Sequence, residues 1–510
     1  MEVIQDHLLS LILFSPTVAA LLILLLPHSR VKVIRWAATL ASLIPFGLAV
    51  WLWFTYDSSA SGFQYVERAV WYEAIGSSYF LGVDGISVSM VLLTTLLTPL
   101  ALLISWNVGD RVRTFMALFL LLETGMLGVF LSLDLLLFFV FWEVGLIPMY
   151  FLINQWGSAN REYASFKFLI YTMAGSLGLL LAIQLIGVTA GTFDLLEITS
   201  KWTALDQPLQ LLGLPITLPT STVKTIAFWA FVVAFAIKVP IWPFHTWLPD
   251  AHTEAPTGGS MILAGVLLKL GAYGFLRLVL PLYPVEAKQF AGVLGLLGTL
   301  AIIFGAFASW GQNDFKRLVA YSSVNHMGFV VLGIAAAAFV QNGSQDAVIA
   351  LNGAVLQMFN HGLSAAGMFL LVGVIYERTH SRDLDSYGGL FPLAPVYGGI
   401  LIFTGMASLG LPGLNGFVSE FLVVRGSWPI LTLYTALSMI GLLITGAYIL
   451  KGIKKVLQGP LNEKWLGHRL EINRREILAI APLMLLMLLI GIWPSWILGV
   501  INNTILRLFG

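Results

Sequence analysis

The sequence has no cysteine among its 510 residues, and only 10% of its side chains are charged. Without cysteine there can be no disulfide, no thiolate zinc site and no cysteine-ligated iron–sulfur cluster. We therefore expect no electron transfer through this chain. Soluble domains carry about a quarter charged residues, whereas this chain is 58% hydrophobic. The composition predicts a polytopic membrane protein, and the formal net charge of +1 gives no reason to expect nucleic-acid binding.

Nucleotide-binding motifs are also missing. The sequence has no GxxxxGK[ST] stretch and no GxGxxG after a predicted strand, and strands do not alternate with helices. The apolar runs leave little chain for a soluble domain of ordinary size. We expect neither a bound nucleotide nor an appended catalytic domain.

Apolar segments long enough to cross a bilayer recur along the whole chain. A transmembrane helix needs roughly 20 apolar residues, and a window of about 19 residues predicts fourteen spans. They cover 8–26, 33–54, 84–106, 114–132, 135–154, 164–190, 222–246, 258–280, 288–309, 317–338, 348–376, 393–424, 430–452 and 477–500. Only the connections 55–83, 191–221 and 453–476 are substantial. The first run follows Glu2 and Asp6 instead of a basic segment, so we interpret it as a retained helix.

Lys and Arg placement tests this map, because cytoplasmic loops of membrane proteins carry the excess of these residues. Of the 27 basic residues, 18 fall on one side, 6 on the other and 3 inside predicted spans. A missed or extra helix would have mixed the two sides downstream. The asymmetry makes the first side cytoplasmic, which predicts that both termini are on the outer side.

Ionisable side chains inside the spans are the candidate functional residues. A charge at mid-bilayer costs roughly 2.5–3.5 kcal/mol or more, so such groups usually face a partner or a water-filled path. Arg277, near the end of its span, is interpreted instead as snorkelling to the interface. The candidates for a proton relay are Glu143, Lys238, Lys269, His326, His361 and Glu420, with Glu123 as a further possible member.

Two spans contain helix-breaking residues beside a charge. Lys238 precedes Pro240 and Pro243, where the helix should end and its partial negative charge would favour the ammonium. Glu420 follows a Gly/Pro-rich break at 411–416 and is predicted in the first turn of the second half. Transporters place ion sites at such breaks. The two breaks lie five helices apart with opposite charges, which indicates an internal duplication; two unrelated proline kinks are the alternative.

The other candidates suit proton transfer by their chemistry. Lys269 lies mid-helix, where desolvation lowers a lysine pKa. His326 and His361 have ordinary pKa values near 6.5 and suit a shuttle, although a membrane histidine also serves as an interhelical hydrogen bonder. Glu123 either pairs with a relay lysine or bonds to Thr124.

A metal site is the weaker hypothesis. The segment HTWLPDAHTE contains ligand types in His245, Asp250, His252 and Glu254. No helical pair of histidines accompanies them, so a capping or loop-bonding role is preferred. We expect no metal in this chain.

Six segments carry a resemblance to a known family. They are FFVFWEVGLIPMYFLI with Glu143, AFAIKVPIWPFHTWLPDAHTEAPT with Lys238, LAGVLLKLGAYGFLR with Lys269, DFKRLVAYSSVNHMGF with His326, AVLQMFNHGLSAAGMFLLVG with His361 and SLGLPGLNGFVSEF with Glu420. In order and spacing they resemble the antiporter-like membrane subunits of respiratory complex I. L-type and N-type members of that family carry Lys at the position matched by Glu420.

The resemblance implies fourteen helices with two inverted five-helix repeats and two discontinuous helices. The corresponding parts are 1–113 for three N-terminal helices, 114–280 and 288–452 for the repeats, and 453–510 for a cytoplasmic connection and the last span. Glu143 would pair with Lys238, Lys269 would be the central relay lysine, His326 and His361 further carriers, and Glu420 the exit acid.

By the same resemblance, NADH, FMN, iron–sulfur clusters and quinone belong to partner subunits, and this chain would translocate protons beside related L-type and N-type subunits. The expected location is a bacterial inner membrane, with a thylakoid-type membrane as a further possibility. Subunits of Mrp-type cation/proton antiporters and of membrane-bound hydrogenases share these motifs and are the alternative reading. A standalone secondary transporter for an organic solute is a second alternative.

Overall fold

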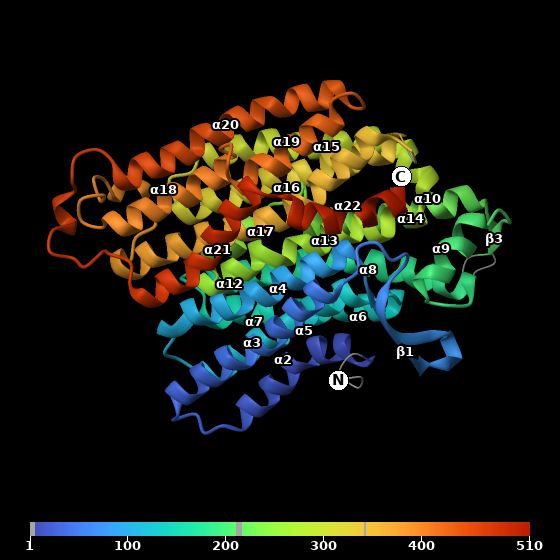
Figure 1. Ribbon diagram of the computed structural model, residues 1–510, viewed down its shortest axis with the longest axis horizontal. Helices are drawn as coiled ribbons and strands as arrows, with labels where there is room; N and C mark the ends of the chain where they lie inside the picture. The colour runs from blue at the N-terminus through green and yellow to red at the C-terminus, as the bar shows by residue number, and fades with distance from the viewer. Residues whose placement is uncertain (1–5, 211–216, 341–342, 510) are drawn as a thin grey trace.

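The long helices of the computed structural model run side by side and form one bundle (Figure 1). The structure describes residues 6–210, 217–340 and 343–509. Within these ranges, 13 helices are long and apolar enough to cross a membrane. The multi-pass, helical architecture predicted from the composition is confirmed.

The first half of the chain contains the N-terminal helices, two small hairpins and the first broken span. Its elements are α2 (Leu8–Leu25), α3 (Val31–Thr55), β1 (Gln64–Tyr72), β2 (Ser77–Val83), α4 (Gly85–Ile104), α5 (Val112–Leu131), α6 (Leu135–Val144), α7 (Leu146–Trp156), α8 (Arg161–Ala190), α9 (Leu195–Ala204), β3 (Leu209–Gln210), β4 (Thr217–Leu218), α10 (Thr220–Lys238), α11 (Trp247–Glu254), α12 (Thr257–Ile262), α13 (Leu268–Gly274) and α14 (Leu280–Leu282).

The second half is helical throughout apart from its connections. It comprises α15 (Pro284–Trp310), α16 (Phe315–Val340), α17 (Gln345–Thr379), the short turn η5 (Leu384–Ser386), α18 (Pro395–Leu409), α19 (Asn415–Ser427), α20 (Thr432–Leu457), α21 (Arg474–Ile492) and α22 (Ser495–Phe509). The predicted span 393–424 is divided between α18 and α19. In the predicted span 222–246, the helix α10 ends at Lys238, and α11 begins only at Trp247, after the span. Both predicted breaks are therefore present.

The connections hold structure that the hydropathy window did not predict. The 55–83 connection folds into the antiparallel β1–β2 hairpin, and the 191–221 connection contains α9 and the β3–β4 pair. The last predicted span ends earlier than expected, because Pro494 interrupts the chain and α22 begins as a separate helix. Short strands and amphipathic helices have no sustained apolar run, so a 19-residue average does not detect them.

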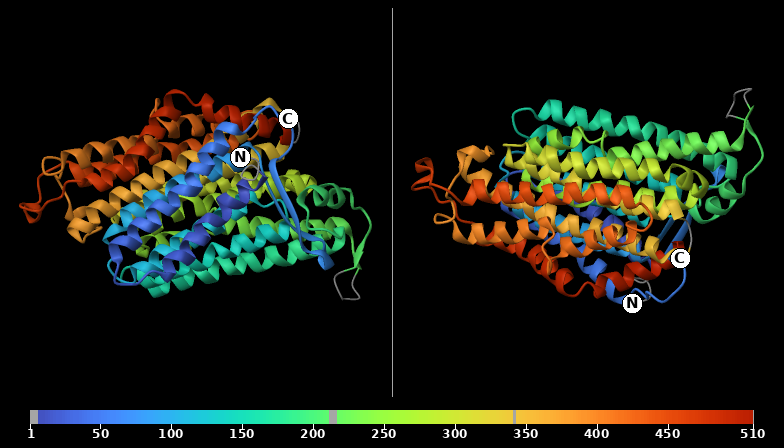
Figure 2. Two further views of the ribbon diagram at one scale, coloured as in Figure 1. Left: turned by 60° about the horizontal axis from the view of Figure 1, so that its bottom comes forward. Right: turned by 90° about the horizontal axis from the view of Figure 1, so that it is seen from above.

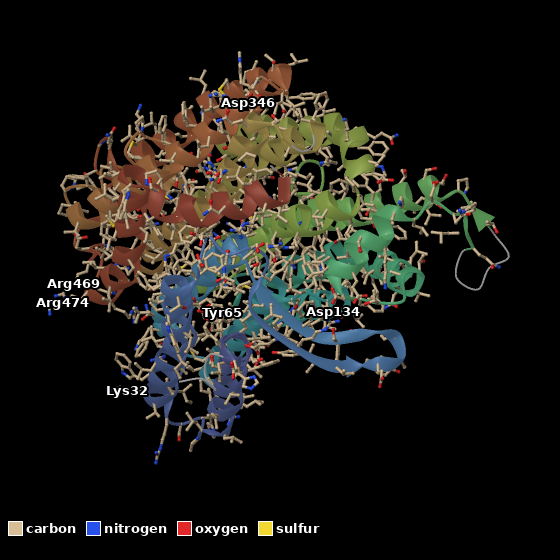
Figure 3. The ribbon with its side chains drawn as sticks, turned by 45° about the vertical axis from the view of Figure 1, so that its right-hand side comes forward. Lys32, Tyr65, Asp134, Asp346, Arg469 and Arg474 are labelled. Carbon is tan, nitrogen blue, oxygen red and sulfur yellow. The ribbon has the colours of Figure 1, made fainter. Side chains whose placement is uncertain are left out.

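The two ends of the bundle differ in charge. We call the end formed by the connections 26–30, 105–111, 157–160, 311–314, 380–394 and 458–473 the basic end, and the opposite end the hairpin end. Lys32, Arg469 and Arg474 lie at the basic end, away from the hairpin near Asp134 (Figure 3). At the hairpin end the Leu9 amide donates to Glu67 of β1, and Arg507 donates to backbone carbonyls near Ser59. Both described chain ends therefore lie at the hairpin end.

Burial is greatest in the helices that carry the candidate residues. In the segment from Thr257 to Leu282 and in α17, every residue of the most hydrophobic window is buried, whereas in α3, α20 and α21 only a third is. Figure 1 shows α20 along the upper edge of the bundle, and both views of Figure 2 show the β1–β2 hairpin at one end of it. The centre of the bundle is thus α12–α14 and α17.

Two isolated antiparallel β-bridges, one at each end of the bundle, connect the chain in the same way. The segment before α6 pairs with the segment after α8 through Asp134 and Asp194, close to β2. The segment before α16 pairs with the segment after α17 through Asp314 and Asp383, at the basic end. In each bridge, the residue just before one membrane span pairs with a residue just after the following span.

Candidate functional site

The most buried helix of the bundle presents a lysine to a histidine of its neighbour. Lys269 is 0% exposed, and its Nζ lies 2.7 Å from Nδ1 of His361 on α17. The same ammonium donates to the carbonyl of Ala264, within a wide π-helical turn over Leu263–Leu267. Such turns often occur at functional sites. The side chain thus bonds to groups inside the protein instead of to water.

Two histidines and a glutamate continue this contact across the second half of the chain. The rings of His361 and His326 have centroids 5.8 Å apart. Nδ1 of His326 lies 2.8 Å from Oε1 of Glu420, which is 4% exposed. We call Lys269, His361, His326 and Glu420 the polar chain, because each member contacts the next and all are buried.

Further polar groups fix the end of the polar chain at Glu420. Gln357 Nε2 donates to Glu420 Oε1 at 3.1 Å, and the Tyr448 hydroxyl lies 3.4 Å from Nε2 of His326. Oε2 of Glu420 is buried and has no hydrogen-bond partner among the described residues. One carboxylate oxygen is therefore held while the other is free to carry a proton. Neither Gln357 nor Tyr448 was predicted, since neither is charged.

The position of Glu420 in its helix differs from the prediction. α18 ends at Leu409 and is capped by Gly410 with φ of +85°, the left-handed conformation that glycine tolerates, and α19 starts at Asn415. Glu420 is therefore in the second turn of α19, not the first. Because helix-dipole effects decline within the first turn, His326 and Gln357 are the groups that stabilise this carboxylate.

Lys238 and Glu143 lie near each other but form no direct ion pair. Lys238 is the last residue of α10, as predicted, and is 2% exposed. Its Nζ lies 5.0 Å from the centre of the Trp142 ring, a cation–π geometry, and Glu143 is the residue that follows Trp142 in α6. No Glu143–Lys238 contact occurs among the ion pairs of the described chain, and Glu143 Oε1 is buried without a hydrogen bond. Trp142, whose ring contacts the Lys238 ammonium, was not predicted from the sequence.

Close helix packing brings Lys238 towards Lys269. A Cβ added to Gly271 would lie 2.8 Å from the Phe235 carbonyl and 3.0 Å from the Lys238 Cβ. The last turn of α10 thus touches α13 two residues beyond Lys269. Only glycine allows this approach.

Glu123 and Arg277 differ in how they are compensated. Glu123, in α5, is 0% exposed. Neither of its carboxylate oxygens has a hydrogen-bond partner within bonding distance and angle among the described residues. It contacts no member of the polar chain by hydrogen bond. Arg277 was expected to reach the interface, but it is 4% exposed and ion-paired with Asp84, the N-cap of α4. The snorkelling interpretation is wrong, because a carboxylate is available inside the bundle.

The residues of the HTWLPDAHTE segment hold helices together. Asp250 pairs with Lys167 at 2.7 Å and with Arg317 at 3.0 Å, and Glu254 accepts the Asn160 amide. His252 stacks on Phe369 with ring centroids 4.3 Å apart. Within the described ranges no group of three potential metal ligands comes together.

The basic end contains a pocket next to a buried lysine. A cavity of about 480 Å³ is bordered by Glu254, Lys316 and Glu377, among others. Lys316 is only 7% exposed, and its ammonium donates to the Ala255 carbonyl. The sequence counted Lys316 among the basic residues of the cytoplasmic side, because hydropathy does not show that this first-turn residue of α16 packs against Ala255.

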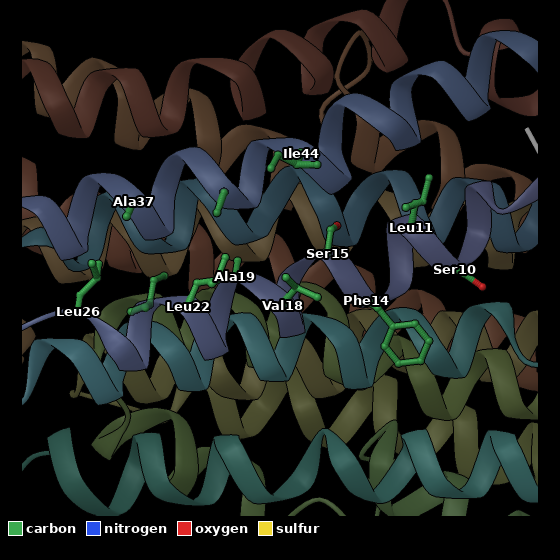
Figure 4. Close-up of a pocket in the computed structure, with 12 residues that line it drawn as sticks. Ser10, Leu11, Phe14, Ser15, Val18, Ala19, Leu22, Leu26, Ala37 and Ile44 are labelled. Carbon is green, nitrogen blue, oxygen red and sulfur yellow. The ribbon is translucent and has the colours of Figure 1, made fainter. Parts of the chain in front are cut away.

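Another cavity, of about 540 Å³ between α2 and α3, has no part in this chemistry. Its lining is almost wholly apolar, with Phe14, Leu22 and Ile44 among the side chains that border it (Figure 4). No ionisable group borders it. The candidate site is the buried polar chain, not this surface groove.

Comparison with known proteins assigns the family. The family model described as "NADH:quinone oxidoreductase/Mrp antiporter, TM" matches residues 132–445. NADH-quinone oxidoreductase subunit M of Rhodobacter capsulatus is 41% identical over 511 residues, covering 99% of this chain and 96% of that protein.

Solved structures agree with this assignment. A chain of respiratory complex I from Thermus thermophilus with bound NADH matches with a TM-score of 0.84 and 29% identity, covering 98% of this chain and 100% of that chain. A chain of the Mrp complex from Dietzia sp. DQ12-45-1b has a TM-score of 0.79 and 24% identity, covering 97% of this chain and 52% of that chain, and shows the fold alone. The chain is thus a multi-pass membrane protein of the NADH-quinone oxidoreductase subunit M family.

Proposed function

We propose that this chain is a proton-translocating, antiporter-like subunit of a complex I-type NADH:quinone oxidoreductase. The observation that carries the proposal is the polar chain: a buried lysine, two histidines and a carboxylate in successive contact at the centre of the bundle. These groups can pass a proton from one to the next, since each binds and releases protons. The family assignment supports the link to the oxidoreductase.

The residues have different roles in this proposal. Lys269 holds a proton at the centre, His361 and His326 pass it on, and Glu420 releases it through its free oxygen towards the outer side. Glu143 and Lys238 act as a charge pair that biases Lys269 electrostatically, and the contact at Gly271 brings the end of α10 with Lys238 close to the Lys269 helix. Among the described residues Glu123 forms no hydrogen bond to the polar chain, so we assign it an electrostatic role. NADH, FMN, iron–sulfur clusters and quinone would reside in partner subunits, including L-type and N-type relatives.

Inverted repeats over 114–280 and 288–452 are part of the proposal. The two bridges, one through Asp134 and Asp194 and the other through Asp314 and Asp383, support them, because they join matching spans at opposite ends of the bundle. The breaks after α10 and after α18 also fall at matching places. The parts 1–113 and 453–510 would then flank the repeated core.

Cutting the polar chain tests the function. We expect His361→Gln to lower NADH-driven proton transport by the intact complex in vesicles about 100-fold, since a positioned proton-transfer group contributes roughly 10²–10⁴-fold. Glutamine retains hydrogen bonding but does not titrate. His468→Gln, at a histidine on the exposed 458–473 connection, is the matched control and should behave as wild type. Wild-type transport by assembled His361→Gln would refute the relay.

The chains that co-purify separate the alternatives. Mass spectrometry of the detergent-purified complex should identify NADH-oxidising and quinone-reducing subunits. A hydrogenase, or only small membrane proteins, would point to the hydrogenase or Mrp-type assemblies instead. Solute uptake by the isolated chain in liposomes would favour a standalone transporter.

In the proposed orientation the protein lies in a bacterial inner membrane. Its basic end faces the cytoplasm, and both termini lie on the outer side of the membrane. Because the chain has no cysteine, a cysteine introduced at Gly467 or at Ser200 gives a unique site in this subunit. We expect a membrane-impermeant thiol reagent to label the first only in inverted vesicles and the second only in right-side-out vesicles. Labelling of both from one face would contradict this topology.

A further inference from the structure

The basic end of α20 borders a cavity that plays no part in the relay. The cavity measures about 830 Å³ and lies between α20 and the turn η5. Its polar lining includes Asp385, Tyr387, Lys451, Lys454, Lys455 and Gln458. Its apolar lining includes Ala447 and Leu450, one to two turns further into the membrane. The cavity therefore joins a cationic rim to an apolar wall.

The outward face of α20 changes character at this cavity. Leu443, Ala447, Leu450 and Lys454 are spaced at i, i+4, i+7 and i+11, which places them on one helix face. Leu443 is 75% exposed and Leu450 is 51% exposed, so no other part of the described chain covers the apolar part of this face. α20 lies on the outside of the bundle and leads into the 458–473 connection (Figure 1). This face of α20 is thus apolar from Leu443 to Leu450 and cationic at Lys454.

The three lysines are not equally engaged. Lys451 Nζ donates to the carbonyls of Trp310 and Gln312, closing the end of α15. Lys455 pairs with Asp385, and this hydrogen bond lowers the pKa of the Asp385 carboxyl, which stays ionised. Lys454 is exposed and has no hydrogen-bond or ion-pair partner among the described residues. Three ammonium groups against one carboxylate leave the cavity positively charged.

From this geometry we infer that the cavity binds the phosphate group of one anionic phospholipid, whose acyl chains lie along the apolar face of α20. The basic side of a membrane protein faces a leaflet whose anionic lipids attract lysines near the bilayer surface. Lys454 contacts the phosphate, and Leu450 and Leu443 contact the acyl chain below it.

A phospholipid fits better than a free anion or a protein segment. A free anion would use the cationic rim but would leave the exposed Leu443 and Leu450 unexplained. A partner helix would cover the apolar stripe but would need an acidic residue at one fixed height, next to Asp385. A lipid supplies both the charge and the apolar length, at the depth where the bilayer itself holds them.

Lipid retention by the intact complex is the test. The complex is reconstituted in phosphatidylcholine vesicles with or without phosphatidylglycerol, extracted, and its bound lipids are counted by native mass spectrometry. We expect Lys454→Gln to bind one phosphatidylglycerol roughly fivefold more weakly, the effect of about one lysine charge at the surface. Lys454→Arg should retain the lipid. Lys464→Gln, in the 458–473 connection and outside this cavity, is the matched control and should also retain it.

A second measurement uses a different position. A photoreactive amino acid at Leu450 should crosslink to phospholipid in the assembled complex. Crosslinking to a protein subunit instead would overturn the inference. Unchanged retention in Lys454→Gln, equal retention of phosphatidylcholine, or displacement by inorganic phosphate would also overturn it, the last in favour of a free-anion site.

Discussion

Replacing Lys269 with methionine should reduce NADH-driven proton transport and quinone reduction by the intact complex at least about 100-fold, the scale of one proton-transfer group. Lys269 is the first member of the polar chain, and methionine has similar length without a proton to give. The change leaves Nδ1 of His361 without its buried partner, so assembly of the complex is verified before transport is compared. Proton uptake in vesicles, normalised to assembled complex, measures the effect.

The variant Lys269→Arg distinguishes a residue that must release its proton from one that only needs a positive charge. Arginine keeps the positive charge but does not lose its proton in proteins, so a relay lysine cannot be replaced by it. A purely structural cation would tolerate arginine better than methionine. Lys288→Met, at an exposed lysine in the first turns of α15, is the control and should leave transport unchanged. Wild-type transport by the arginine variant would exclude Lys269 from the relay.

Glu420 should show a characteristic order of activities, with Glu420→Asp above Glu420→Gln. Glutamine preserves the size of the side chain and its bond to Gln357 but cannot release a proton from the position of Oε2. We expect Glu420→Gln to lose transport about 100-fold, the scale of one proton-transfer group. Aspartate keeps the titration with a shorter reach, so partial turnover should remain.

The measurement is proton transport at several pH values in reconstituted vesicles, with quinone reduction followed in parallel. Glu463→Gln, in the 458–473 connection, is the control for loss of one carboxylate and should have no effect. Glutamine activity equal to or above that of aspartate would mean that Glu420 only packs or pairs. The releasing group would then have to be another residue.

The transmembrane spans could be predicted because each is decided locally. A continuous apolar run of about 20 residues has few alternatives to a membrane helix, since every backbone group must be satisfied inside the helix. The breaks at Lys238 and Gly410 were also readable, because proline and glycine act on their own backbone. The hairpin β1–β2, α9 and α22 were missed because their stability comes from packing on the bundle ends.

Residue types for the site were readable as well, because an ionisable side chain in an apolar run is costly wherever it packs. The side chains that these ionisable residues contact could not be predicted from the sequence. The resemblance implied that Glu143 pairs with Lys238, but it did not indicate that Trp142 lies beside the lysine. The sequence suggested an exposed end for Arg277, whereas Asp84 meets it from a helix about 190 residues earlier in the chain. Such partners depend on which helix faces lie together.

The sequence by itself determined that this protein crosses the membrane many times, that its two ends differ in basic charge, that two spans are broken, and that lysines, histidines and glutamates lie within the bilayer. These properties follow from hydropathy and backbone chemistry within one segment. Only the tertiary structure decided that Lys269, His361, His326 and Glu420 form one continuous contact and that α20 ends beside a cationic cavity. It also decided that Glu123 has no hydrogen bond to the polar chain among the described residues. Those facts depend on distances of a few ångströms between helices that are far apart in the chain, which helix packing alone fixes.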